Sequence, residues 1–229
     1  MPLIDLLAPP TCAACRRPAT GQICGECLRR LPWLRGHRCP RCALPRHRSG
    51  CPAAAAAFDR AWAPLAYEGA ARDIVRALKF QAALPLAGVM AAHMAANLPA
   101  DLRAPPAVPG APPPAAAFAL VPVPPHRGRL RRRGFDPAAL LAAALAERAG
   151  LPLAACLRRA DRGRRQVGAG RSLRRSAGRF AAVVTAPPPR AAVLVDDVHT
   201  TGATLDVCAR ALKQGGAGWV GAATYVRTL

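Results

Sequence analysis

Lysine, acidic residues and aromatic residues are scarce in this sequence. The 229 residues include 12 Asp and Glu against 33 Lys and Arg, and aromatic residues make up 4%. Few aromatics leave few side chains on which nucleic-acid bases could stack. The shortage of acids leaves a formal charge of +21, which predicts a polyanionic partner such as nucleic acid, phosphate or an anionic surface. Only Lys79 and Lys213 are lysines, so a codon bias toward Arg also accounts for part of this charge.

A long apolar run is missing as well. No stretch of about 18 residues is free of both charge and proline, so we expect no membrane span. Residues 1–12 have neither a basic n-region nor a clear cleavage site, so we expect no signal peptide and a cytoplasmic protein. An apolar fraction of 52% excludes a wholly disordered chain, and the length fits one medium domain with a small module.

Cysteines are concentrated near the N-terminus, where seven of the nine lie between positions 12 and 51. Two Cys-x2-Cys knuckles with an 8-residue spacer provide the four thiolates of a tetrahedral zinc site. The expected ligands are Cys12, Cys15, Cys24 and Cys27. Because about 50 residues with few large apolar side chains build little core, a structural metal would stabilise this segment. A disulfide framework is the weaker alternative, since seven is an odd number and no secretory signal is present.

A second, degenerate zinc ribbon is expected directly after the first. Cys39, Cys42 and Cys51 supply three ligands, and Ala54 stands where a closing cysteine would fall. His47 is the expected fourth ligand, with His37 as an alternative, and a site of three cysteines or none also remains open. The compositional change that follows predicts a domain boundary at residue 55, with a second domain over residues 56–229.

The second domain has the pattern of an α/β fold. Short apolar runs alternate with segments of helical periodicity, which favours a mainly parallel sheet flanked by helices. Asp136-Pro137 and Gly150 are good start and stop signals for one of the helices. Residues 99–117 form a Pro/Ala-rich surface insert that we expect to lack regular structure. The expected strands are 61–67, 118–123, 191–195 and 219–227, and the expected helices are 70–79, 85–98, 137–149 and 204–214.

One segment carries recognisable chemistry, the sequence AVLVDDVHTTGAT at 192–204. A buried parallel strand ends in Asp196 and Asp197, and a turn rich in Thr and Gly then opens a helix. Backbone N–H groups at a helix N-terminus suit a phosphate dianion, and Gly202 allows close approach of the backbone. The two carboxylates would repel a phosphate unless they accept hydrogen bonds from the hydroxyls of an attached sugar. The segment therefore predicts a ribose-5-phosphate site, while a capped helix after an ordinary turn is the alternative.

This segment resembles the phosphoribosyl-pyrophosphate (PRPP) motif of type I phosphoribosyltransferases. The resemblance implies that Asp196 and Asp197 bind the ribose and form the catalytic pair, with Mg²⁺ bound together with PRPP. It also implies that the 5-phosphate contacts Thr200, Thr201, Gly202, Ala203 and Thr204. His199 stands where the motif usually has an apolar or aromatic residue, which matters little if its side chain faces solvent.

A second stretch, VPVPPHRGRLRRRGFD at 121–136, is similar to the signature of the ComF family. That family pairs a double zinc ribbon with a phosphoribosyltransferase-like domain and is associated with DNA uptake in natural competence. The resemblance implies a type I phosphoribosyltransferase-like fold for the second domain. Asp136 replaces the family's usual Asn, the second ribbon lacks its closing cysteine, and the Pro/Ala insert is additional.

Most of the excess charge lies in one block, since residues 121–180 hold 15 Arg against 3 acids. Guanidinium groups bind phosphate oxygens bidentately, so the part of this block after 121–124 suits a pyrophosphate. Arg127 and Arg133 are the expected contacts, although a solvated basic loop is the alternative. Lys79 is expected to reach a phosphate or the acidic pair. Residues 158–180 occupy the place of the mobile loop that closes over PRPP in related enzymes.

Two functions follow from these features. In the first, the protein is a PRPP-binding phosphoribosyltransferase. In the second, it is a non-catalytic competence component that senses a nucleotide or 5′-phosphate, and its Arg-rich surface contacts single-stranded DNA or a competence helicase.

Overall fold

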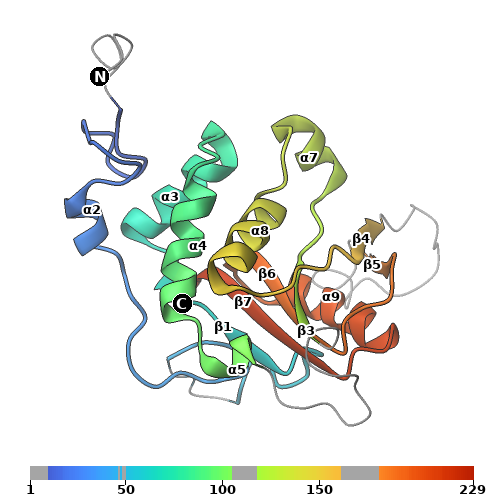
Figure 1. The fold of residues 1–229 in the computed structure, drawn as a ribbon. Helices are drawn as coiled ribbons and strands as arrows, with labels where there is room; N and C mark the ends of the chain where they lie inside the picture. Colours follow the sequence, from blue (N-terminus) through green and yellow to red (C-terminus); the bar gives the residue numbers. More distant parts are fainter. Residues whose placement is uncertain (1–9, 46, 48–49, 105–117, 161–180) are drawn as a thin grey trace, which may run out of the picture.

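A parallel β-sheet with helices on both faces forms the body of the protein (Figure 1). The computed structural model describes residues 10–45, 47, 50–104, 118–160 and 181–229. The strand order is β1-β7-β6-β3, and β2 also pairs with β7. All of these pairings are parallel. The strands are β1 (Arg60–Trp62), β2 (Leu65–Ala66), β3 (Phe118–Pro122), β6 (Ala191–His199) and β7 (Trp219–Arg227).

Side chains of the central strand β6 alternate between two hydrophobic cores, as the two-residue period of a strand requires. Val193 and Val195 belong to the first core, together with residues of α3, α4 and α8. Ala192 and Leu194 belong to the second core, together with residues of α9. A strand covered on both faces contains few polar residues until it leaves the core, which explains the apolar run before Asp196.

The helices confirm most of the expected pattern, including the α/β fold class. Helix α8 starts after Asp136, whose carboxylate accepts a hydrogen bond from the Ala138 backbone N–H at 3.0 Å, and ends at Gly150 with φ of 64°. The helices that cover the sheet are α3 (Gly69–Gln81), α4 (Leu86–Asn97), α8 (Pro137–Ala149) and α9 (Ala203–Gln214). Within the described ranges, every helix is too short or too polar to cross a lipid bilayer.

Five details of the expected pattern were wrong. The strand expected at 191–195 does not end at the acidic pair, because β6 stays paired with β7 as far as His199. The strand expected at 61–67 is split into β1 and β2. The first residues of the Pro/Ala insert form a short helix, α5 (Ala100–Arg103), while residues 105–117 lie outside the described residues. The Arg-rich segment expected as a loop contains helix α7 (Arg127–Arg133). The start of the expected mobile loop is a strand, β4 (Leu157–Ala160), which pairs antiparallel with β5 (Ala181–Val184); residues 161–180 lie outside the described residues.

The N-terminal segment packs against both faces of the sheet. Cys12, Ile23, Cys27 and Leu31 join the first core, and helix α2 (Gly25–Arg29) lies among them. Cys42, Ala43 and Ala53 join the second core. Between them the chain passes the edge of the sheet, where the Ala66 N–H donates to the Pro32 carbonyl and the Ala61 N–H to the Pro40 carbonyl. The domain boundary at residue 55 remains a prediction, since this segment shares both cores with the sheet.

Candidate functional site

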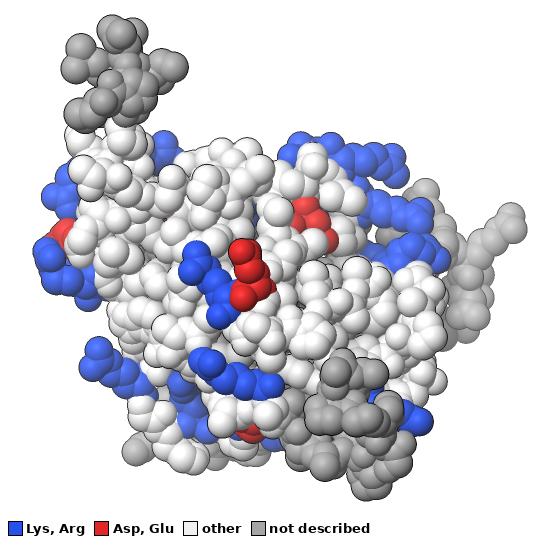
Figure 2. All heavy atoms as spheres, in the orientation of Figure 1, with Lys and Arg blue, Asp and Glu red and all other residues white. Residues whose placement is uncertain are grey.

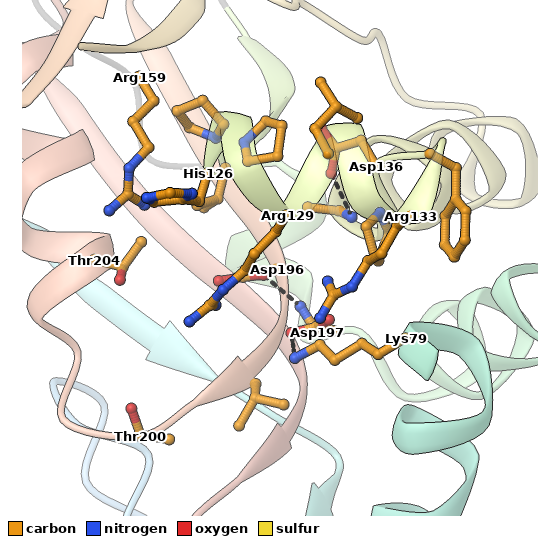
Figure 3. Close-up of a pocket in the computed structure, with 18 of the residues that line it drawn as sticks. Lys79, His126, Arg129, Arg133, Asp136, Arg159, Asp196, Asp197, Thr200 and Thr204 are labelled. Atoms are coloured by element: carbon orange, nitrogen blue, oxygen red, sulfur yellow. Dashed lines mark hydrogen bonds and ion pairs between the residues drawn. The ribbon is translucent and has the colours of Figure 1, made fainter. Parts of the chain in front are cut away.

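A cavity of about 330 Å³ opens at the carboxyl ends of β3 and β6, which are neighbours in the sheet. In an open α/β sheet this is where ligands bind. Its polar side chains come from the end of β6 and the turn after it, from helices α3 and α7, from the start of α8 and α9, and from β4 (Figure 3). Its charged and hydroxyl-bearing lining residues include Lys79, Arg129, Arg133, Asp136, Arg159, Asp196, Asp197, Thr200 and Thr204.

The two carboxylates of β6 have different surroundings because adjacent strand residues point to opposite faces. Asp197 points toward α3 and is 5% exposed, and its Oδ1 lies 2.7 Å from the Nζ atom of Lys79. The Oδ1 of Asp196 instead accepts a hydrogen bond from the Asp197 backbone N–H at 2.8 Å. Burial raises the pKa of Asp196 well above its usual value, and the neighbouring charge of Asp197 raises it further. A cation or a hydroxyl donor bound at Asp196 would relieve this penalty.

Helix α7 presents guanidinium groups to the acidic pair. Arg129 and Arg133 are four residues apart, so they lie on one face of the helix and both line the cavity. The guanidinium of Arg133 lies 5.1 Å from the centre of the Phe80 ring, and its buried Nε finds no hydrogen-bond partner among the described residues. Burial lowers the pKa of Arg133, partly offset by the charge of Asp197. An anion in the cavity would satisfy that buried N–H group.

The turn at 200–204 connects β6 to α9. Gly202 adopts φ of 80° as the N-cap of α9, and a Cβ atom there would lie 2.9 Å from Nε2 of His199, so both the backbone angle and the space favour glycine. Thr200 and Thr204 line the cavity, whereas Thr201, Gly202 and Ala203 are not among its lining residues. His199 does not face solvent: it is 2% exposed and packs edge-on against Phe58. Burial, helped by the charge of Arg227, lowers its pKa to about 4, so its ring is neutral.

The structure brings most of the residues expected from the sequence to one cavity. Lys79 contacts the acidic pair, and Arg133 lines the cavity beside it. Arg127 is not among the lining residues. Sequence reasoning did not select Arg129 or Arg159, which do line the cavity. Recognition of 127–133 as a helix would have favoured Arg129, because it shares a face with Arg133.

The first zinc ribbon has the geometry of a metal site. The sulfurs of its four cysteines lie within 4.8 Å of one another, and those of Cys15 and Cys24 are 3.7 Å apart. Tetrahedral zinc with Zn–S bonds of about 2.3 Å places sulfurs about 3.8 Å apart, whereas a disulfide requires about 2.05 Å. All nine cysteines are free. Hydrogen bonding to Arg17 lowers the pKa of Cys15 to about 6, which favours the thiolate that binds metal.

The second zinc ribbon closes with a histidine. Ligand atoms of Cys39, Cys42, His47 and Cys51 lie within 4.8 Å of one another, with Cys39 and Cys51 sulfurs 3.7 Å apart. His47 is therefore the fourth member of the set, and His37 is not part of it. Burial raises the pKa of Cys39, but hydrogen bonds with His47 and with backbone amides of the knuckle outweigh it and lower the value to about 6. Both ligand sets suit structural Zn²⁺.

Comparison with known proteins agrees with this reading of the N-terminal segment. Residues 3–57 match the family model described as "Double zinc ribbon domain". No match was found among curated proteins. The N-terminal quarter of the chain is thus a double zinc ribbon with one site of four cysteines and one of three cysteines and a histidine.

Proposed function

We propose that the protein binds PRPP, or a closely related phosphorylated ribose, in the cavity at the ends of β3 and β6. One observation carries the proposal: two adjacent carboxylates, a Thr/Gly turn at a helix N-terminus and a face of guanidinium groups all meet at this cavity. A phosphate alone needs no carboxylates, and a sugar alone needs no cluster of Arg. A pentose that carries phosphate at both ends requires all three.

Each part of the ligand has a suitable partner. The 200–204 turn, with the hydroxyls of Thr200 and Thr204, suits the 5-phosphate. Asp196 and Asp197 accept hydrogen bonds from the two ribose hydroxyls. Arg129 and Arg133 suit the pyrophosphate, since guanidinium groups pair with phosphate oxygens bidentately. Lys79 holds Asp197 in place and limits the repulsion between that carboxylate and the phosphates.

Mg²⁺ fits the same donors. It prefers carboxylate and phosphate oxygens, and burial raises the pKa of Asp196, a penalty that a bound cation would relieve. Asp196 and Asp197 would hold the ion together with ligand oxygens, and its charge would offset that of the leaving pyrophosphate. Around it, Arg129 and Arg133 would stabilise negative charge on the same leaving group, and the two carboxylates would stabilise positive charge on the ribose. This arrangement supports phosphoribosyl transfer of the type I kind, while the link to the ComF family and to DNA uptake rests on the resemblance of residues 121–136.

Binding of PRPP with Mg²⁺ tests the proposal directly. Millimolar PRPP should raise the melting temperature of the protein, and the combined change Asp196→Asn with Asp197→Asn should abolish that rise. Asp73→Asn is a matched control, because Asp73 lies on α3 and is not among the residues lining the cavity. The absence of any shift with the unchanged protein would contradict the proposal.

Two arginines of α7 allow direct contact with the ligand to be distinguished from the effect of the helix's overall charge. Arg129 lines the cavity, while Arg131, two residues further along the helix, is exposed and does not. Arg129→Ala should weaken PRPP binding about 10-fold or more, as expected for loss of a charge-assisted hydrogen bond. Arg131→Ala should leave it within about 2-fold. Equal effects, measured by titration calorimetry, would mean that α7 acts only through its overall charge.

A second function, nucleic-acid binding, is favoured by the basic extension of the cavity. A further hollow is lined by His126, Gly128, Arg129, Arg132 and Arg159, with no acid among them. In Figure 2, Lys and Arg gather on the part of the surface that α7 occupies in Figure 1. Such a surface would contact a DNA backbone, with affinity that falls steeply as salt rises. This function predicts single-stranded DNA binding at physiological salt that survives the change of both carboxylates; loss of binding at that salt would exclude it.

A further inference from the structure

Arg227, near the end of β7, joins the second zinc ribbon to the 200–204 turn. Its side chain is 5% exposed. Its Nε donates to the carbonyl of Cys42 at 2.8 Å, and its Nη1 donates to the carbonyls of His199 at 3.0 Å and Thr200 at 2.5 Å. Nη1 also donates to the Thr228 carbonyl at 2.5 Å. One planar guanidinium thus spans a metal-ligand residue and the start of the turn.

The positive charge of Arg227 also links it to the second metal site. Among the described residues, no carboxylate forms an ion pair with it, so backbone carbonyls solvate this buried cation. Three thiolates, one neutral imidazole and one Zn²⁺ together carry a net charge of −1. The loaded second ribbon is therefore an anion beside a buried cation, and loss of the metal would change both charge and shape at this contact.

Further contacts connect the same two regions. Phe58, which follows the second ribbon, packs edge-on against His199, with ring centres 6.1 Å apart. The backbone N–H of Ala57 donates to Asp206 in the first turn of α9 at 2.6 Å. The first ribbon has a different neighbourhood, because its buried residues join the core on the opposite face of the sheet.

We propose that Arg227 is a positioning residue that couples metal binding at the second ribbon to the conformation of the 200–204 turn. Metal at Cys39, Cys42, His47 and Cys51 fixes the Cys42 carbonyl, the carbonyl fixes the guanidinium, and the guanidinium fixes the backbone of His199 and Thr200. Coupling of this kind is reciprocal, so a ligand at the turn also strengthens metal binding at the second ribbon. The phosphate role of the turn rests on the function proposed above, whereas the coupling does not.

Hydrogen exchange in two ligand variants tests the coupling without any phosphate ligand. Cys51→Ser removes a ligand of the second ribbon that does not touch Arg227, and Cys15→Ser is the matched change in the first ribbon. Each should lose one zinc per chain. Amide exchange over 200–204 should rise about 10-fold or more in Cys51→Ser, within the usual range of coupling, and should stay unchanged in Cys15→Ser. Equal exchange in the two variants would overturn the proposal.

Arg227→Lys provides an independent test that leaves every metal ligand in place. A lysine donates from one atom, so it does not reach both the Cys42 carbonyl and the carbonyls of His199 and Thr200 as a guanidinium does. The variant should release zinc from the second ribbon faster to a chelator and should release it from the first ribbon at the wild-type rate. Millimolar PRPP should slow release from the second ribbon in the wild type and not in Arg227→Lys. If PRPP does not bind at all, the proposed function fails, while the hydrogen-exchange experiment still decides the coupling. Unchanged zinc release from the second ribbon in Arg227→Lys would overturn the proposed coupling.

Discussion

The two zinc ribbons have similar metal sites and different neighbours. The first contributes large apolar side chains, Ile23 and Leu31, to the core shared with α3, α4 and α8. The second contributes small buried side chains, Ala43 and Ala53, and the partly buried Leu44 to the core shared with α9, yet it is hydrogen-bonded through Arg227 to the turn at the cavity. The comparison suggests that one metal site mainly stabilises the fold, while the other mainly supports the candidate site.

The largest expected effect is loss of either metal. Cys12→Ser and Cys42→Ser each replace a buried ligand, and each should remove one zinc and lower the free energy of unfolding by more than about 4 kcal/mol, because metal binding contributes directly to folding. Cys12→Ser should cost more, since the first ribbon carries more apolar area. Denaturant unfolding with metal analysis measures both. If Cys42→Ser proved the more destabilising, the division between the two ribbons would be wrong.

Loss of an apolar contact should likewise destabilise the protein more in the first ribbon than in the second. Leu31 is 6% exposed, so Leu31→Ala should lower the free energy of unfolding by about 2–4 kcal/mol through lost burial and a cavity. Ala53→Gly, at a site 7% exposed in the second ribbon, should cost about 1 kcal/mol. Both variants should retain two zinc ions. Thermal or denaturant unfolding of the loaded proteins would show whether the difference in apolar packing has its expected weight.

A third prediction tests whether the charge of Asp196 in the cavity affects stability independently of both zinc ribbons. Because the pKa of Asp196 is raised in the folded state, its ionisation destabilises the fold as pH rises above the unfolded value of about 3.9. Asp196→Asn should therefore raise the melting temperature at pH 8, by about 2–4 °C per kcal/mol of penalty removed, and have little effect near pH 4. The same rise in melting temperature should appear when Asp196→Asn is added to the Cys15→Ser variant. A gain that is independent of pH would contradict this account.

The smallest effect compares one backbone position in the two ribbons. Arg16 and Ala43 each follow the second cysteine of a knuckle, with φ of 63° and 60°, and each N–H donates to the carbonyl of the first cysteine. Glycine adopts this conformation without strain, so Arg16→Gly should raise the free energy of unfolding by about 0.5–1 kcal/mol. Ala43→Gly also loses a buried methyl group worth about 0.8 kcal/mol, so its net effect should be near zero. Calorimetric melting would resolve the difference.

Features that depend on local sequence were predictable. Both ends of α8 followed from a capping Asp, a Pro and a Gly that act within one turn. The acidic pair followed from an apolar run that ends abruptly, although the strand itself continues to His199. The zinc ligands followed from spacing, because a Cys-x2-Cys knuckle fixes two sulfurs on one side whatever surrounds it.

Features that depend on distant residues were not. Helix α7 has a single large apolar residue, Leu130, so it shows no helical periodicity, and its N-cap is a histidine, His126, whose ring accepts from the Gly128 N–H. Arg159 reaches the cavity from β4, whose partner β5 is more than 20 residues away in the sequence. The inward orientation of His199 depends on Phe58, which comes from the other end of the chain. No local pattern encodes these contacts.

The β4–β5 pair has a consequence for how this protein tolerates change in length. Ala160 and Ala181 are paired directly, so the two ends of the segment that joins them are held side by side. The entropic cost of closing a flexible segment between two fixed ends grows slowly, by about 0.6 kcal/mol for each doubling of its length. Insertions and deletions between these two alanines would therefore disturb the sheet, the cavity floor and the ribbons very little. This position is one where evolution, or a protein engineer, can exchange a whole segment while the floor of the cavity stays the same.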